Sequence, residues 1–317
     1  MLKNSHKNRE NFNVEFILGG FMSAIIIDGK KIAEEIKDIV KLNIDAIKEE
    51  KLHPVLSVIL VGDDQASKVY VKQKEKACKE IGITSRIIEL PCTCKQEELE
   101  ETIKSQVNDL EVVGILVQLP LPPHLNTKAA LKLIPSYKDV DGFSNINVGK
   151  LWTDNHPTHT ACTPMGVMHI LDEINNDLSG KHVVIVGRSN TVGKPLAALC
   201  LQRNATVTIC HSKTNNLGEI TKQADVLIVA VGKPKLITAD MVKQDAIVID
   251  VGINRVDGKL CGDVDFDNVK EIASYITPVP GGVGPLTIAK LMENTMHAAW
   301  KQRSLLYFSK KEREESV

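Results

Sequence analysis

Tyr70 and Lys74 stand four positions apart in a segment with helical character that follows a buried strand. Residues four apart share one face of a helix, so the phenol and the amine are expected to project together just beyond the carboxyl end of that strand. An amine held there by neighbouring groups could exchange protons with a substrate. On spacing alone the pair could equally be an ordinary exposed pair. Lys72 and Lys76 point elsewhere on the helix, and we expect them to be solvated.

Gln118 argues against the interpretation of Tyr70 and Lys74 as an ordinary exposed pair. It ends a strand that is too apolar to be exposed, and a buried amide needs hydrogen-bond partners. The same edge of the sheet would present Lys74, and Asp141 in the segment from Lys138 to Gly142 could complete the group. Asp141 could also be no more than a turn-forming residue before Gly142.

The segment from Gly187 to Gly193 is a glycine-bearing turn between a strand and a helix. Such a turn directs backbone N–H groups at an anion, although Ser189 stands where a dinucleotide-binding turn usually has its second glycine. Folds that select NAD usually carry an acidic residue at the end of the next strand, and residues 208–213 contain none. Arg188, with Ser212 and Lys213, would instead suit a 2′-phosphate, so NADP is favoured over NAD.

The segment from Thr277 to Pro285 holds three glycines within four positions, bracketed by prolines. It predicts a rigid loop at a helix N-terminus, with backbone N–H groups available to a phosphate or a carboxamide. The alternative is an ordinary connector.

The elements that must position these groups alternate in type along the chain. From Met22 onward the periodicity predicts a helix with an apolar stripe from Ile32 to Ile47, a strand over 55–61, a helix over 67–80, a strand over 86–90, a helix over 96–110 and a strand over 112–119. This βαβαβ order predicts a parallel sheet wrapped by helices. Residues 135–162, rich in Gly, Pro, Asn and Asp, predict a long loop.

A second α/β region follows that loop. Thr163 is expected to cap a helix that Pro164 opens and that ends near residue 174. β-branched runs predict a Rossmann-type sheet with strands over 182–186, 206–210, 226–231 and 246–251, a helix over 192–202 and a last helix over 286–302. The charge-rich residues 309–317 are expected to form a solvated tail.

The composition excludes several classes of protein. The chain has 317 residues, enough for about two domains, with 43% hydrophobic residues and a net charge of −1 from 39 basic and 40 acidic side chains. That balance shows no excess of positive charge of the kind that binds nucleic acid or an anionic membrane. The chain has only 12 aromatic residues, too few to favour base stacking. No apolar run is long enough to span a membrane. Aliphatic side chains must build the core.

The sequence contains little evidence for a metal site or for redox-active cysteines. Seven cysteines are scattered, and Cys92 and Cys94 alone are weak evidence for zinc, so we interpret them as reduced, small hydrophobic residues of a cytosolic protein. His156 and His159 lack a carboxylate at metal-ligand spacing and are interpreted as surface residues. Residues 1–21 are interpreted as a polar extension before Met22.

Taken in order, these motifs resemble one family, the bifunctional methylenetetrahydrofolate dehydrogenases/methenyltetrahydrofolate cyclohydrolases. The resemblance covers residues 22–305, and its most specific pieces are Ala66–Lys74, Gly114–Pro120, Lys138–Phe143, Gly187–Pro195 and Pro278–Pro285. It implies two α/β domains with a cleft between them, of which the second is a Rossmann-type NADP-binding domain. The implied folate-binding catalytic domain comprises 22–160 plus 286–305, the NADP-binding domain 161–285, and the extensions 1–21 and 306–317.

The resemblance also implies a role for each candidate residue. Lys74 would be the catalytic residue of both activities, Gln118 would hydrogen-bond its ammonium, and Asp141 would accept hydrogen bonds from the pterin. The implied substrate-binding residues are Tyr70, Lys74, Val117, Gln118, Leu119, Asp141, Pro280, Gly281 and Gly282. The implied NADP-binding residues are Gly187, Arg188, Ser189, Ser212, Ile253 and Gly284. No metal is implied. The resemblance implies a cytoplasmic homodimer that interconverts tetrahydrofolate one-carbon derivatives for purine biosynthesis.

Two other functions remain open at this point. A shikimate-type NADP-dependent dehydrogenase would share the two-domain layout and a Lys/Asp pair in the cleft. The Tyr70/Lys74 helix and the loop from Thr277 to Pro285 argue against it. A cofactor-binding module without catalysis is the third possibility.

Overall fold

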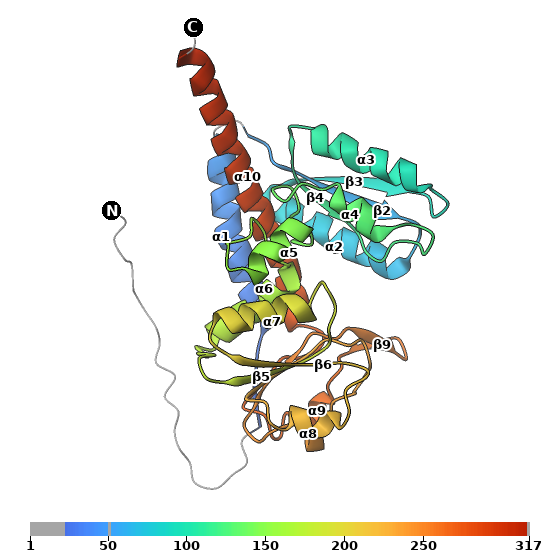
Figure 1. Cartoon of the computed structure of the whole chain (residues 1–317), viewed down its shortest axis with the longest axis vertical. Helices are drawn as coiled ribbons and strands as arrows, with labels where there is room; N and C mark the ends of the chain where they lie inside the picture. The colour runs from blue at the N-terminus through green and yellow to red at the C-terminus, as the bar shows by residue number, and fades with distance from the viewer. Residues whose placement is uncertain (1–22, 50–51, 316–317) are drawn as a thin grey trace.

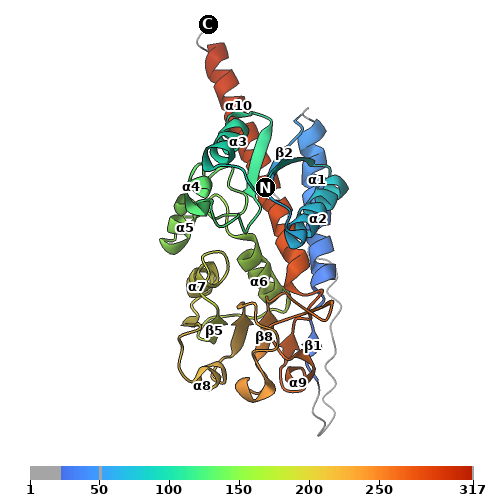
Figure 2. The ribbon, with the colours of Figure 1, turned by 90° about the vertical axis from the view of Figure 1, so that its right-hand side faces the viewer.

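The computed structural model describes residues 23–49 and 52–315, and within them two α/β units are stacked along the long axis of the molecule (Figure 1). The upper unit in Figure 1 holds a three-stranded sheet and the lower unit a six-stranded sheet. A long C-terminal helix runs from the junction of the two units past the upper one and ends beyond it (Figure 2).

The three-stranded sheet is parallel, in the order β3-β2-β4. Every residue of β2 is buried, because helices cover both faces of the sheet. The elements of this part of the chain are α1 (Gly29–Glu49), β2 (Val55–Val61), α2 (Gln65–Ile81), β3 (Thr84–Leu90), α3 (Gln96–Asn108), β4 (Val112–Val117), α4 (Thr127–Lys132) and α5 (Asn145–Trp152).

Helix α2, which carries the candidate site, has a well-defined cap at each end. The Asp64 carboxylate accepts from the backbone N–H of Ser67 at 2.8 Å, so the helix begins before residue 67, where the sequence predicted its start. Gly82 ends it with φ at 85°, a left-handed conformation that favours glycine, and its N–H donates to the Cys78 carbonyl at 2.9 Å. Both caps therefore fix the frame in which Tyr70 and Lys74 project.

The six-stranded sheet is parallel throughout, in the order β1-β11-β8-β7-β5-β6. An antiparallel hairpin, β9 with β10, stands beside it. The elements are β1 (Ile25–Ile26), α6 (Cys162–Glu173), β5 (His182–Val186), α7 (Gly193–Gln202), β6 (Thr206–Cys210), α8 (Leu217–Thr221), β7 (Val226–Val229), a 3₁₀ turn (Ala239–Met241), β8 (Ile247–Asp250), β9 (Asn254–Val256), β10 (Lys259–Cys261), α9 (Phe266–Val269), β11 (Tyr275–Ile276) and α10 (Val283–Glu315).

Both ends of the described chain cross between the two units. Strand β1 pairs with β11 at the edge of the six-stranded sheet, although the sequence prediction placed residues 25 and 26 in the first domain. Helix α1 then enters the upper unit and lies side by side with α10, which also packs on α6 (Figure 1). The division of the chain at residues 160 and 286 remains a prediction.

Several boundaries differ from the sequence prediction. Residues 135–162 are not one loop, because Ser144 caps the short helix α5 by accepting from the Asn147 N–H at 3.3 Å. Ala161, not Thr163, is the N-cap of α6, and the Thr163 hydroxyl instead lies 2.9 Å from the Thr287 hydroxyl on α10. Helix α10 runs to Glu315, so residues 306–315, predicted as extension and tail, are helical. The predicted extension at 1–21 lies outside the described residues.

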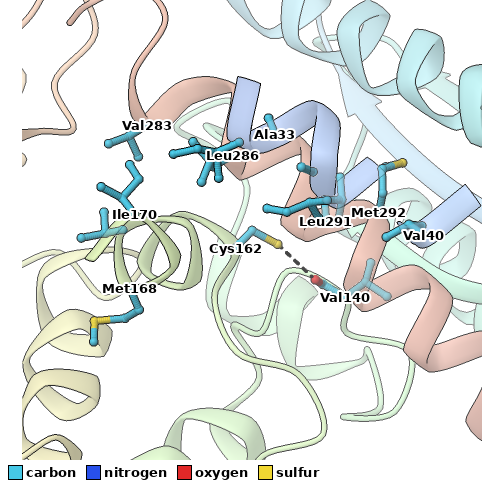
Figure 3. Packing of buried hydrophobic residues seen from close by; sticks show 14 of the residues in the cluster. Ala33, Val40, Val140, Cys162, Met168, Ile170, Val283, Leu286, Leu291 and Met292 are labelled. Atoms are coloured by element: carbon cyan, nitrogen blue, oxygen red, sulfur yellow. Dashed lines mark hydrogen bonds between the residues drawn. The ribbon is translucent and has the colours of Figure 1, made fainter. Parts of the chain in front are cut away.

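An aliphatic core joins the units, as the scarcity of aromatic residues predicted. Side chains from α6 and α10 meet those of α1 there, among them Ile170, Leu286, Leu291 and Val40 (Figure 3). The Cys162 thiol within this cluster donates to the Val140 carbonyl at 3.4 Å (Figure 3). Among the described residues, no helix is long and apolar enough to cross a membrane.

Candidate functional site

Lys74 and Gln118 lie in contact at the carboxyl edge of the three-stranded sheet. Lys74 is only 9% exposed, and its Nζ donates to Gln118 Oε1 at 2.9 Å, the hydrogen bond that the family resemblance implied. The Gln118 Nε2 donates in turn to the Leu119 carbonyl at 2.8 Å. That second bond fixes the amide with its oxygen toward the amine, so Gln118 holds Lys74 in one orientation. Lys72 and Lys76, on other faces of α2, are exposed as expected.

Asp141 faces the same amine from the loop before α5. Burial raises the pKa of Asp141 to about 6, while the positive charge of Lys74 acts to lower that pKa. Within the described residues no hydrogen bond to the Asp141 carboxylate is formed, which leaves its oxygens able to accept from a ligand. The structure therefore brings Lys74, Gln118 and Asp141 into one polar group.

The loop that carries Asp141 is held by residues that sequence reasoning missed. The buried Asp139 carboxylate accepts from the N–H groups of Phe143 and Ser144 at 3.1 and 2.7 Å and from Asn147 Nδ2 at 2.9 Å. Asn294 on α10 donates its amide to the Val140 carbonyl at 2.8 Å. Asp139 could have been found from the sequence, because it belongs to the same Lys138–Phe143 motif as Asp141. The contact of Asn294 with Val140 could not, because it depends on how a distant helix packs.

Tyr70 lies one turn before Lys74 and lines a neighbouring cleft of about 980 Å³ between α1, α2 and the six-stranded sheet. Burial raises the pKa of the Tyr70 phenol, so it stays protonated at neutral pH. Pro280, Gly281, Gly282, Gly284 and Ile253 also line this cleft. Lys74, Gln118 and Asp141 are not among its lining residues, so the predicted substrate residues form two groups, with Tyr70 in the cleft one turn away from the amine.

Val117 and Leu119, the two remaining predicted substrate residues, flank Gln118. Val117 is the last residue of β4 and its side chain belongs to the aliphatic core. Leu119 is partly buried, and its carbonyl is the acceptor that orients the Gln118 amide. Any contact that Val117 makes with a ligand must therefore come from its backbone.

The turn after β5 has the close packing that a dinucleotide site needs. Gly187 has φ of 134° and donates its N–H to the Cys210 carbonyl at 2.9 Å. A Cβ at Gly187 would lie 2.3 Å from the Ala230 carbonyl oxygen, and one at Gly193 would lie 2.1 Å from the Gly187 oxygen. The Ser189 hydroxyl accepts from the Val192 N–H at 3.1 Å, which sets the first turn of α7. The turn is therefore tight enough for a phosphate to approach the start of α7.

Arg188 and Ser212 each follow one of two paired strands. Strand β5 pairs in register with β6, with Val186 opposite Cys210, so the residues that follow each strand are neighbours. Arg188, Ser212 and Lys213 are all exposed there. The segment after β6 carries no carboxylate, so this edge presents cations and hydroxyl groups, the donor set that suits a 2′-phosphate.

The glycine-proline loop after β11 lies against both units. Gly281 has φ of 108°, and a Cβ at Gly29, the first residue of α1, would lie 1.9 Å from the Gly282 oxygen. A Cβ at Gly284 would lie 3.7 Å from Cδ1 of Ile253. The loop thus joins the start of α1, the start of α10 and the segment after β8 around the cleft.

The interpretation of His159 as a surface residue is wrong. Its side chain is 2% exposed, its Nε2 lies 3.2 Å from the Tyr137 carbonyl, and burial lowers its pKa. The composition of this segment did not reveal the burial, because the contacts depend on how the segment folds: the His159 N–H also donates to Asn147 Oδ1 on α5 at 3.5 Å. His156 is exposed. Within the described residues there is no group of three or more His, Cys, Asp or Glu side chains that could hold a metal ion.

One unit has a parallel sheet with a glycine turn that suits a dinucleotide, and the other has a buried lysine. Together they define a class of enzymes with two α/β units around a cleft. The chain belongs to the tetrahydrofolate dehydrogenase/cyclohydrolase family. The model of the family's catalytic domain matches residues 27–141, and that of its NAD(P)-binding domain matches residues 161–303.

Individual relatives agree with the family match. The bifunctional protein FolD of Halalkalibacterium halodurans is 55% identical over 278 residues, which cover 88% of this chain and 99% of that protein. The crystal structure of FolD from Campylobacter jejuni has a TM-score of 0.87 at 48% identity and covers 88% of this chain and 99% of its own. The structure of the Trypanosoma brucei enzyme, solved with NADP and an inhibitor, has a TM-score of 0.85 at 36% identity, covering 88% and 98%.

Proposed function

We propose that this chain oxidises 5,10-methylenetetrahydrofolate to 5,10-methenyltetrahydrofolate with NADP and then hydrolyses that product to 10-formyltetrahydrofolate. The observation that carries the proposal is the 2.9 Å hydrogen bond from the buried Lys74 amine to Gln118, beside an Asp141 carboxyl with open acceptor positions. The family match favours this function over a shikimate-type dehydrogenase.

The residues around β5 and β6 fit NADP. The N–H groups at the start of α7, with Gly187 and Ser189, would hold the pyrophosphate, while Arg188 and Ser212 would hold the 2′-phosphate. Ile253 and Gly284, which face each other on the wall of the cleft, would contact the nicotinamide end. When bound, the cofactor accepts a hydride.

The residues of the upper unit would orient the folate. Asp141 accepts hydrogen bonds from the pterin ring, and the Tyr70 ring lies against the folate. Leu119, Pro280, Gly281 and Gly282, with the backbone of Val117, shape the surrounding surface. The resulting placement of two rings face to face makes hydride transfer effectively intramolecular.

Lys74 serves both steps through its position. Loss of a hydride from the methylene carbon leaves a cationic methenyl carbon between two nitrogens of the folate. A water oxygen then bonds to that carbon and one carbon–nitrogen bond breaks. The released nitrogen takes one of the two water protons, and the other proton leaves as the formyl group forms. Lys74 moves that proton, and Gln118 keeps its Nζ in place.

We also propose the two-domain division given above, a homodimer formed through the dinucleotide-binding units, and a cytoplasmic location for one-carbon metabolism. Strand β6 is an outer strand of its sheet, and such edges are open to pairing. All seven cysteines are free, which agrees with a reducing compartment. Light scattering on the purified protein tests the dimer.

A coupled assay tests the proposed activities. The protein is given methylenetetrahydrofolate with NADP or with NAD, and both the methenyl and the formyl products are followed. We expect both products, with a lower KM for NADP. Lys74→Ala should lower cyclohydrolase activity by about 100-fold or more, while NADP still binds. Lys72→Ala, which removes an exposed lysine of α2 that does not line the cleft, is the matched control and should leave both activities unchanged.

Three outcomes would contradict the proposal. Normal formyl product from Lys74→Ala would remove that residue from the chemistry. Tight NADP binding without turnover of either folate would indicate a binding module. Turnover of shikimate would restore the dehydrogenase alternative.

A further inference from the structure

Asp263 is a completely buried carboxylate for which neither the predicted site nor the proposed mechanism has a use. It follows the β9–β10 hairpin, between Gly262 and Val264. Four donors surround its two oxygens, and each of them belongs to the loops at the carboxyl ends of two central strands, β7 and β8.

The loop after β7 supplies three of these donors. Asp263 Oδ2 accepts from the N–H groups of Val231 at 2.7 Å and Gly232 at 2.9 Å, and Oδ1 accepts from that of Lys233 at 2.8 Å. The fourth donor is the Asn254 side-chain amide, 2.8 Å from Oδ1, in the segment after β8. One carboxylate therefore ties two adjacent loops together.

Asp250, the last residue of β8, supports Asp263 from beneath. Its Oδ1 accepts from the N–H of Asp263 at 3.0 Å and from that of Gly252 at 2.9 Å, and its Oδ2 accepts from Val264 at 2.9 Å. The close approach of the backbone to the two carboxylates depends on two glycines. A Cβ at Gly262 would lie 1.8 Å from Asp250 Oδ2, and one at Gly252 would lie 2.3 Å from Asp263 Oδ1.

The two tied loops border the proposed cofactor site on both sides. Ala230, just before the first loop, donates to the Val186 carbonyl at 2.8 Å, and its oxygen is the atom that a Cβ at Gly187 would strike. In the second loop, Asn254 directly follows Ile253, which faces Gly284. Asp263 thus lies behind the backbone between the glycine turn and the glycine-proline loop.

We propose that Asp263, supported by Asp250, is a positioning residue for hydride transfer. It fixes the loops after β7 and β8 as the surface on which the nicotinamide end of NADP rests. The inference rests on the proposed function, since it concerns the dehydrogenase step. It has a specific consequence: the cyclohydrolase step, which uses Lys74, Gln118 and Asp141 in the other unit, should not depend on Asp263.

Asp263→Asn tests the proposal with little change of shape. The asparagine NH₂ group would face backbone N–H donors that the carboxylate oxygen now accepts from, so the two loops would separate locally. We expect the KM for NADP to rise about tenfold or more, with a lower dehydrogenase kcat. Cyclohydrolase activity, measured on methenyltetrahydrofolate without cofactor, should stay within about twofold of the original. Calorimetric titration with NADP measures the loss of binding directly.

Asp225→Asn is the matched control. Asp225 precedes the same strand β7 at its amino end, where its carboxylate accepts from the His182 N–H at 2.8 Å and from Lys243 at 2.6 Å. It also ties two strands, but far from the proposed site, so its loss should leave the KM for NADP unchanged. If Asp263→Asn does not yield soluble protein, Asn254→Ala removes one donor to the same carboxylate and should raise the KM for NADP by about two- to threefold.

An unchanged KM for NADP in the soluble variant would overturn the proposal, as would an equal fall of both activities. These results are distinct from failure of the proposed function, which would show in the unsubstituted protein as the absence of one or both folate activities.

Discussion

Asp141 and Asp250 are carboxylates with the same perturbed pKa, about 6, and burial is the main cause for both. Their partners differ. Asp250 accepts from three backbone N–H groups, whereas within the described residues Asp141 has no hydrogen bond of its own and faces the charge of Lys74. A raised pKa alone therefore does not separate a chemical group from a structural one. The two roles are separated by the number of hydrogen-bond acceptor positions that the fold leaves open on the carboxylate.

The sharpest test of this contrast is Asp250→Asn. The asparagine oxygen can still accept from Gly252 and Asp263, but its NH₂ group would face the N–H of Val264. A buried donor left without an acceptor costs up to about 3 kcal/mol, and loss of the buried charge offsets part of this cost, so the free energy of unfolding should fall by roughly 2 kcal/mol at neutral pH. Urea unfolding followed by circular dichroism measures the change. A loss below about 0.5 kcal/mol would mean that the backbone bonds to Asp250 contribute little.

Asp141→Asn should change the free energy of unfolding in the opposite direction and stabilise the protein. A folded-state pKa above the ordinary value of 3.8 means that the protonated carboxyl favours folding; this contribution is present below about pH 4 and is lost as the pH rises through 6. Asparagine resembles the protonated form, so the variant should be more stable than the original by roughly 1–2 kcal/mol at pH 8 and nearly equal to it at pH 4. The same unfolding measurement at the two pH values checks this. Equal stability at pH 8 would show that Lys74 compensates the buried charge fully.

The smallest expected effect is on substrate binding. Below pH 6 a growing fraction of Asp141 is protonated and loses an acceptor for the pterin N–H groups. The KM for methylenetetrahydrofolate should therefore rise by about two- to fivefold between pH 7.5 and pH 5.5. Asp141→Asn should bind more weakly at every pH, with no inflection near 6. An inflection that survives in this variant would belong to another group.

The difference between the two aspartates also explains what the sequence could predict. Lys74 and Gln118 could be placed together, with Tyr70 one helix turn away, because the spacing of four on a helix and the end of a parallel strand are local patterns with fixed geometry. Asp141 became a candidate for a similar reason, its place in a short motif. The roles proposed for these residues still await experiment.

Asp263 and Asn294 could not be predicted in this way. Each acts on backbone groups of segments that are remote in sequence, and no local period encodes such a partner. The same reason underlies the errors in the fold. Strand β1 is too short to show which sheet it joins, and His159 is buried against Tyr137 and the α5 residue Asn147, in a segment whose composition concealed a helix.

Helices α1 and α10, which lie side by side, belong to the two ends of the described chain. Synthesis delivers α1 first and α10 last, so the apolar stripe of α1, with Ile36, Val40 and Ile44, has no complete partner until the last helix emerges from the ribosome. Helix α10 also packs on α6, so the core that joins the two units is complete only when α10 is in place. Docking of α10 is therefore the step that completes this shared core, and until it occurs the apolar stripe of α1 lacks that cover.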